Sequence, residues 1–62
     1  MPKPKFEIYK DAAGKFRFRL VAPNGENIAA SEAYESKRAC EDGAKSVKTN
    51  APKADIVDLT GA

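Results

Sequence analysis

Apolar and polar side chains alternate along the first half of the chain, which is the pattern of β-strands. The clearest example is 16–20, where Phe16, Phe18 and Leu20 alternate with two arginines. Successive side chains of a strand point to opposite faces, so one face here is aromatic and aliphatic and the other is cationic. We therefore predict a strand over 15–22 whose apolar face contributes to a core.

A second strand is predicted over 6–10, where Phe6 and Ile8 share one face. The segment 11–14 between the two strands is rich in turn residues, and Gly14 can adopt a positive φ. The two strands should therefore form an antiparallel hairpin.

A third strand is predicted over 26–31, with Ile28 as its apolar anchor. It follows the pair Asn24-Gly25, which is a strong hairpin signal because both residues tolerate the positive φ of a type I′ turn. The first half of the chain is therefore expected to form a three-stranded meander.

The apolar period changes after Ser31, and the new spacing predicts a helix. Small and apolar residues recur at intervals of one, three and four: Ala39, Cys40, Gly43, Ala44 and Val47. Ser36 is the preferred N-cap, although Ser31 could begin the helix earlier. Asn50 and Pro52 are expected to end it. Glycine inside a helix costs roughly 1 kcal/mol relative to alanine, so Gly43 predicts a close approach of helix and sheet.

A last strand is predicted over 54–59, because Ile56, Val57 and Leu59 are apolar. Ile56 and Val57 would point to opposite faces, so this strand is expected to be buried on both sides. The predicted order is β-β-β-α-β, an α+β fold in which one helix covers one face of a small antiparallel sheet. A strand buried on both sides in such a small chain suggests a second subunit.

The chain has only 62 residues, so it is predicted to be one domain, a module over 5–60 preceded by a flexible segment 1–4. A domain of this size is marginally stable and often needs disulfides, metals or oligomerisation. One cysteine and no histidine exclude an internal disulfide and a zinc site built from one chain. Oligomerisation remains, and we expect a symmetric homodimer.

Charge and hydropathy add little about function. The net charge of +2 is too mild to indicate nucleic acid by itself. No apolar stretch suits a signal peptide or a membrane span. We therefore expect a cytoplasmic protein in which Cys40 stays reduced.

The chain resembles the YegP-like domains of unknown function from about Lys5 to Thr60. The matching strings are FEIYK at 6–10, Gly14, FRFRL at 16–20, NGE at 24–26, IA at 28–29, SE at 31–32, Tyr34, SK at 36–37, Cys40, Gly43, SV at 46–47, NA at 50–51 and VDL at 57–59. The family occurs as single modules or tandem pairs, so the resemblance implies that a single module pairs with itself. It implies no activity, cofactor or catalytic residue.

The candidate binding or interface residues are Arg17 and Arg19, with Tyr9 on the same face of the sheet. Arginine favours phosphate because its planar fork is bidentate, which would suit nucleic acid. The same strip could instead be solvated or paired across strands with Glu7 and other carboxylates. It could also lie in a dimer interface, where Arg and Tyr are enriched.

Other residues invite functional interpretations that we find less persuasive. Phe16 and Phe18 share the phase of their apolar neighbours, which favours the core over base stacking. Cys40 lies on the apolar stripe, which favours packing over nucleophilic or redox chemistry. Tyr34 is a candidate contact residue in the irregular segment before the helix, but we favour a ring that closes the end of the core. Asp55 and Asp58 are three apart in a strand and so would not share a face, which argues against a carboxylate pair.

These observations favour a non-enzymatic homodimeric assembly or binding module without catalytic, cofactor or metal residues. The alternative is a weak nucleic-acid-binding protein that uses the basic face of the sheet. No membrane or small-molecule partner is expected.

Overall fold

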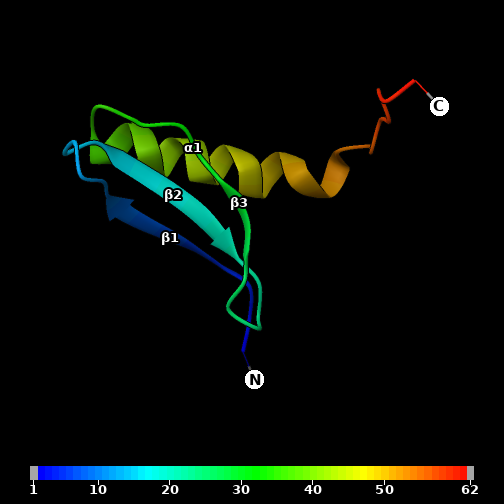
Figure 1. Ribbon diagram of the computed structural model, residues 1–62, viewed down its shortest axis with the longest axis horizontal. Coiled ribbons are helices and arrows are strands. Elements are labelled where there is room, and N and C mark those ends of the chain that lie inside the picture. Colours follow the sequence, from blue (N-terminus) through cyan, green and yellow to red (C-terminus); the bar gives the residue numbers. More distant parts are fainter. Residues whose placement is uncertain (1, 62) are drawn as a thin grey trace.

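The computed structural model describes residues 2–61 and shows a three-stranded antiparallel sheet with one helix across one face (Figure 1). The elements are β1 (Lys5–Lys10), β2 (Phe16–Val21), β3 (Asn27–Ala30), α1 (Lys37–Asn50) and the short 3₁₀ helix η1 (Ala51–Lys53). The strands lie in the order β1-β2-β3, so β2 is central and β1 and β3 are the edges. The predicted α+β meander with one covering helix is confirmed.

The first turn forms as its sequence predicts. Gly14 has φ 81° and its N–H donates to the carbonyl of Asp11 at 3.0 Å. The Asp11 side chain accepts hydrogen bonds from the N–H groups of Ala13 and Lys15, both at 2.9 Å. β1 and β2 then pair without interruption from Lys5–Val21 to Lys10–Phe16.

The second turn is not type I′, so that prediction was wrong. Gly25 has φ 90°, but no residue other than glycine has positive φ within 2–61, which excludes Asn24. Pro23 fixes φ near −65° and so begins an ordinary turn, closed by the Gly25 N–H donating to Ala22 at 2.9 Å. The Asn24 side chain instead accepts from the Glu26 N–H at 3.1 Å. A register shift at Leu20–Val21 follows, and β3 is short.

The core lies between β2 and α1. Phe18, Cys40 and Ala44 are buried together, and Phe18 is 7% exposed. Phe6 meets the Phe18 ring edge-on, with 5.9 Å between centroids. Ser36 is the N-cap, as predicted, and its hydroxyl accepts from the Ala39 N–H at 3.1 Å.

Gly43 brings α1 close to the sheet, as expected from its position on the small-residue stripe. A Cβ added at Gly43 would lie 3.3 Å from a ring carbon of Phe18 and 2.5 Å from the hydroxyl oxygen of Tyr34. Any larger side chain would therefore have to displace one of these rings.

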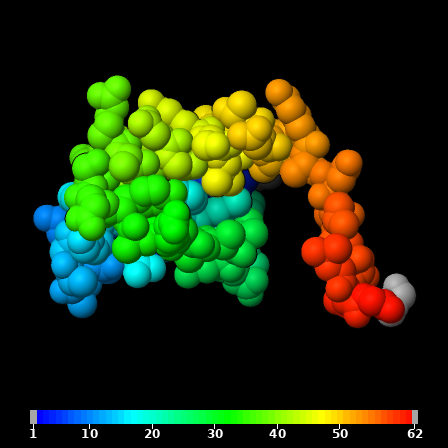
Figure 2. All heavy atoms as spheres, turned by 90° about the horizontal axis from the view of Figure 1, so that it is seen from above, coloured from blue at the N-terminus to red at the C-terminus, as the bar shows by residue number. Residues whose placement is uncertain are grey.

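The last predicted strand does not form, so the prediction of a strand buried on both faces was wrong. Residues 54–59 follow η1 as an irregular segment that stands apart from the sheet (Figure 2). Ile56 is 100% exposed, Val57 71% and Leu59 90%. The apolar side chains suggested a strand, but a strand needs a neighbour, and no strand within residues 2–61 lies beside this segment.

Candidate binding surface

Tyr9, Arg17 and Arg19 come together on the face of the sheet opposite α1. In the β1–β2 register Tyr9 lies opposite Arg17, and Glu7 lies opposite Arg19. Their neighbours Ile8 and Phe18 point to the helix side. The sequence pattern therefore placed these three candidate residues on the correct face.

Each arginine of this face is paired with a carboxylate. Arg19 Nε lies 2.7 Å from Glu7 Oε1, and Arg17 Nε lies 2.7 Å from Asp11 Oδ2. Lys5 Nζ adds a longer contact of 3.3 Å to Glu7 Oε2. The face is thus a ladder of opposite charges across strands rather than a free cationic strip.

The ion pairs shift the pKa values of Glu7, Asp11 and Arg17. The hydrogen bond from Arg19, supported by Lys5, lowers the pKa of the Glu7 carboxyl below its usual value. The hydrogen bonds from Arg17 and from the Lys15 N–H lower the pKa of Asp11, and Asp11 in turn raises the pKa of Arg17. Glu7, Asp11 and Arg17 therefore stay charged at neutral pH, so none of these three groups is poised for proton transfer.

The aromatic ring of Tyr9 also contributes to this ladder. The Arg19 guanidinium lies 4.7 Å from the centroid of the Tyr9 ring, in a cation–π contact. The ring and Glu7 together hold the Arg19 side chain in one orientation. A base that stacked on the same face of the Tyr9 ring would have to displace this guanidinium.

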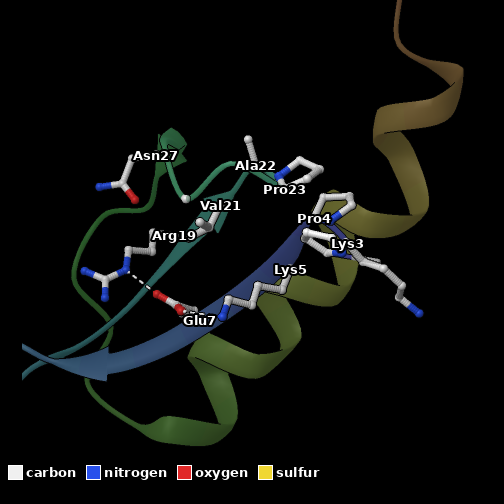
Figure 3. Close-up of a pocket in the computed structure, with 11 residues that line it drawn as sticks. Lys3, Pro4, Lys5, Glu7, Arg19, Val21, Ala22, Pro23 and Asn27 are labelled. Carbon is white, nitrogen blue, oxygen red and sulfur yellow. Dashed lines mark hydrogen bonds and ion pairs between the residues drawn. The ribbon is translucent and has the colours of Figure 1, made fainter.

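A hollow of about 630 Å³ continues the same face toward the start of β1 (Figure 3). Its walls include Lys3, Lys5, Glu7, Arg19, Val21 and Pro23, which come from the N-terminal segment, both long strands and the second turn. Figure 3 shows the ion pair between Glu7 and Arg19, which both line this hollow. Sequence reasoning missed this hollow because its walls are far apart along the chain and carry no motif.

Tyr34 does not join the other candidate residues. Its backbone pairs with Phe16 through two hydrogen bonds of 2.7 and 2.9 Å, which extends the sheet beyond β3. Its ring stacks on Phe18, with 6.3 Å between centroids and 20° between planes. Tyr34 thus packs against the core on the helix side, beside Gly43.

Cys40 is fully buried in the core. Burial raises the pKa of the Cys40 thiol, and the neighbouring Glu41 carboxylate adds to this effect. A raised pKa leaves little thiolate at neutral pH, so packing is the role that this environment supports.

Within residues 2–61 no three or more His, Cys, Asp or Glu side chains gather where they could hold a metal ion. Over the same residues, no helix combines the length and the apolar character needed to cross a membrane.

Comparison with known proteins places this fold in a family. Residues 11–58 match the family described as a domain of unknown function, DUF1508. A UPF0339 protein of Treponema denticola is 62% identical over 89% of this chain and 95% of its own length. The UPF0339 protein YegP of Escherichia coli is 48% identical over 77% of this chain, but over only 44% of YegP itself.

Solved structures agree with the architecture described above. The solution NMR structure of a Haloferax volcanii protein has a TM-score of 0.84 and 47% identity, and the match covers 95% of this chain and all of that one. The solution NMR structure of ATU0232 from Agrobacterium tumefaciens has a TM-score of 0.76 and 49% identity, and covers 92% of both chains. The YegP resemblance read from the sequence is therefore confirmed: this chain belongs to the DUF1508/UPF0339 family, for which no function is established.

Proposed function

We propose that this chain is a non-enzymatic module that works as a homodimer in assembly or binding. The observation that carries the proposal is the exposed segment 54–59, with its three apolar side chains Ile56, Val57 and Leu59. A soluble domain rarely leaves so many neighbouring apolar side chains in water unless a partner covers them.

Burial of this segment would stabilise so small a domain considerably. Burial of one Val, Leu or Ile side chain is worth about 1.5–3 kcal/mol. Whole domains are stable by only about 0.05–0.15 kcal/mol per residue, so three such side chains are comparable to the stability of the rest. A second copy that covered them would therefore stabilise both chains.

The lengths of the relatives support pairing between modules. The chain spans 44% of YegP and 42% of the UPF0339 protein from the ptx operon 5′ region of Stutzerimonas stutzeri. Those relatives are long enough for two modules in one chain. A chain with one module would reach the same arrangement by binding a second copy.

Cys40 and Asp58 carry side chains that could take part in catalysis, but their surroundings favour other roles. Cys40 is buried and its thiol has a raised pKa. The Asp58 carboxylate accepts hydrogen bonds from the hydroxyl and the N–H of Thr60, which lower its pKa. These surroundings favour packing and a local turn over chemistry.

Nucleic-acid binding ranks second. Lys3, Lys5 and Arg19 line the hollow and would attract a phosphate group, although the Glu7 carboxylate in the same lining would repel it. However, Arg17 and Arg19 are already paired with Asp11 and Glu7, and those pairs would have to open or be shared. The dimer proposal needs no such rearrangement.

Sedimentation velocity on the full chain tests the homodimer. At micromolar concentration we expect a species of twice the 6.7 kDa chain mass. The double variant Val57→Ser with Leu59→Ser should shift it toward the monomer, because the apolar contact is lost.

The matched control is Lys45→Ser with Lys48→Ser, two exposed positions of α1, which should leave the dimer unchanged. A folded monomer of the unmodified chain at micromolar concentration would overturn the homodimer.

A further inference from the structure

We propose that the hollow at the start of β1 binds a small phosphomonoester, with the phosphate group at Lys5 and Arg19 and the carbon body against the neighbouring prolines. The hollow is formed within one chain, so this inference does not depend on the homodimer. Its volume of about 630 Å³ lies within the range of about 300–1,000 Å³ that is usual for small-molecule sites.

The charged side chains of the lining leave a surplus of positive charge. Three of them are cationic, those of Lys3, Lys5 and Arg19, and one is a carboxylate, that of Glu7. The surplus is therefore two positive charges. A phosphomonoester carries a charge of about −1.5 to −2 at pH 7, whereas a phosphodiester or a carboxylate carries a single negative charge. The charge of the hollow thus matches a phosphomonoester best.

Glu7 repels a phosphate but also arranges the cations that would hold it. Its Oε1 lies 2.7 Å from Arg19 Nε and its Oε2 lies 3.3 Å from Lys5 Nζ, so it gathers both cations at the hollow. The Tyr9 ring, whose centroid is 4.7 Å from the Arg19 guanidinium, fixes that group further. A side chain that is already held in one orientation loses less entropy when a ligand binds.

Arg19 can hold a phosphate without leaving Glu7. Within residues 2–61 the Arg19 side chain donates its hydrogen bond through Nε, and the acceptor is Glu7. Its Nη groups remain as donors, and the guanidinium fork suits phosphate oxygens. The phosphate would therefore share Arg19 with Glu7 rather than break their ion pair.

The two lysines supply the rest of the positive charge. The Lys5 side chain is 63% exposed and its contact with Glu7 is long, so its ammonium can turn to a ligand at little cost. Lys3 has no carboxylate partner among residues 2–61. Figure 3 shows the Lys3 side chain extending away from the other labelled residues, and its flexible stem lets the ammonium swing back over a bound phosphate.

Prolines give the hollow an apolar wall beside its charged groups. Pro4 and Pro23 line it from the N-terminal segment and from the second turn. In Figure 3 both lie away from the ion pair of Glu7 and Arg19. Because proline rings are stiff, they offer a fixed surface to the carbon body of a ligand. The Asn27 amide, also in the lining, provides a donor and an acceptor for a polar substituent.

Titration of the isotope-labelled full chain with phenyl phosphate, followed by its amide NMR signals, tests this site. In a buffer of low ionic strength without phosphate, we expect saturable shifts at Lys5, Glu7 and Asn27 and much smaller shifts along α1. Inorganic phosphate should bind more weakly, because it has no carbon body to contact the prolines. Shifts that do not saturate, or that are as large along α1, would overturn the inference.

Two matched pairs of lysines separate a site from general attraction by net charge. Lys3→Ser with Lys5→Ser should weaken phenyl phosphate binding about fivefold, because two exposed charge pairs with the ligand are lost. Lys45→Ser with Lys48→Ser removes the same charge from exposed positions of α1, and screening should keep its effect within about twofold. Equal losses in the two double variants would overturn the site.

Glu7→Gln provides the sharpest test, because it should tighten binding. Removal of the carboxylate relieves the repulsion of a nearby phosphate and should increase the affinity for phenyl phosphate about fivefold. The amide spectrum of the free variant reports whether its fold is kept. An unchanged or lower affinity in a folded Glu7→Gln chain would place the phosphate elsewhere and overturn the inference.

A short oligothymidylate without a terminal phosphate distinguishes a small ligand from nucleic acid. We expect it to bind more weakly than phenyl phosphate, because each phosphodiester carries a single negative charge. Tighter binding of the oligonucleotide at the same amides would assign the hollow to nucleic acid and overturn the phosphomonoester. Sedimentation decides the homodimer separately, so the homodimer and this site can fail independently.

Discussion

The sheet and the helix α1 together form the body of the molecule, residues 5–50. The body and the segment 54–59 both carry apolar side chains typical of strands, but they differ in what surrounds those side chains. Phe18 in β2 is 7% exposed, whereas Leu59 is 90% exposed. Two tight turns place β2 between β1 and β3, and α1 covers its apolar face. The segment follows η1 away from the sheet and meets no such neighbours (Figure 1). The apolar pattern therefore identifies residues suited to burial, but the turns and loops that connect the elements decide whether the chain can bury them itself.

The largest difference should appear when one apolar side chain is removed from each region. Phe18→Ala should lower the free energy of unfolding by about 3–5 kcal/mol, because it opens a cavity among Phe6, Tyr34 and Cys40. Leu59→Ala should change it by less than about 0.5 kcal/mol in dilute monomer. Urea unfolding followed by circular dichroism measures both.

If Phe18→Ala does not fold, Phe18→Leu can replace it in the comparison with Leu59→Ala, because leucine retains part of the buried apolar surface. Its cost should lie between those of the other two variants. An effect of Leu59→Ala as large as that of Phe18→Leu in dilute solution would contradict the separation of the segment from the body.

Much of the body could be predicted from its sequence, because its signals are local. Alternation identified the strands, Ser36 marked the start of α1, and Gly43 indicated the close approach of α1 to the sheet. The prediction of a type I′ turn was wrong because Pro23 begins an ordinary turn, in which Asn24 does not adopt a positive φ. The last strand failed because strand pairing depends on a neighbour that local sequence does not specify.

The candidate surface was predictable only in part, for a similar reason. Alternation placed Tyr9, Arg17 and Arg19 on one face, and cross-strand pairing with Glu7 was among the interpretations considered. The Asp11–Arg17 pair depends on how the first turn bends back over the sheet. The Tyr34 ring packs against the core, as the favoured interpretation had it, but its bridge to Phe16 follows an irregular segment and had no signal in the sequence.

A smaller effect is expected where α1 contacts the sheet. Gly43→Ala should lower the free energy of unfolding by about 1 kcal/mol. Overpacking against Tyr34 and Phe18 costs about 1–3 kcal/mol, and the better helix propensity of alanine returns about 1 kcal/mol. Thermal or urea unfolding of the full chain provides the measurement.

Asp42→Ala is the control for Gly43→Ala, because Asp42 is the exposed neighbour on the same helix. It should have an effect within about 0.5 kcal/mol. A stabilising effect of Gly43→Ala would contradict the close contact between α1 and the sheet that the Cβ distances indicate. The body would then be loosely packed, and tight packing would not be what distinguishes it from the segment.

The smallest effect should separate two aspartates, one in each region. The pKa of Asp11 is lowered chiefly by Arg17 across the β1–β2 turn, and that of Asp58 by Thr60 within the segment. A carboxyl with a lowered folded-state pKa adds stability that is complete above its unfolded pKa and is lost as pH falls through the folded value. The Asp11 contribution should therefore disappear on acidification from about pH 5 to below the folded pKa of Asp11, and it should be small because the pair is solvent-accessible.

Asp11→Asn keeps an acceptor for the turn N–H groups but loses the charge, so its unfolding curve should change less between pH 6 and low pH than that of the unmodified chain. Asp58→Asn should leave the acid dependence of body unfolding unchanged in dilute monomer, because its partners lie within the segment. Equal effects of the two variants would mean that the segment unfolds together with the body, which its exposed side chains argue against.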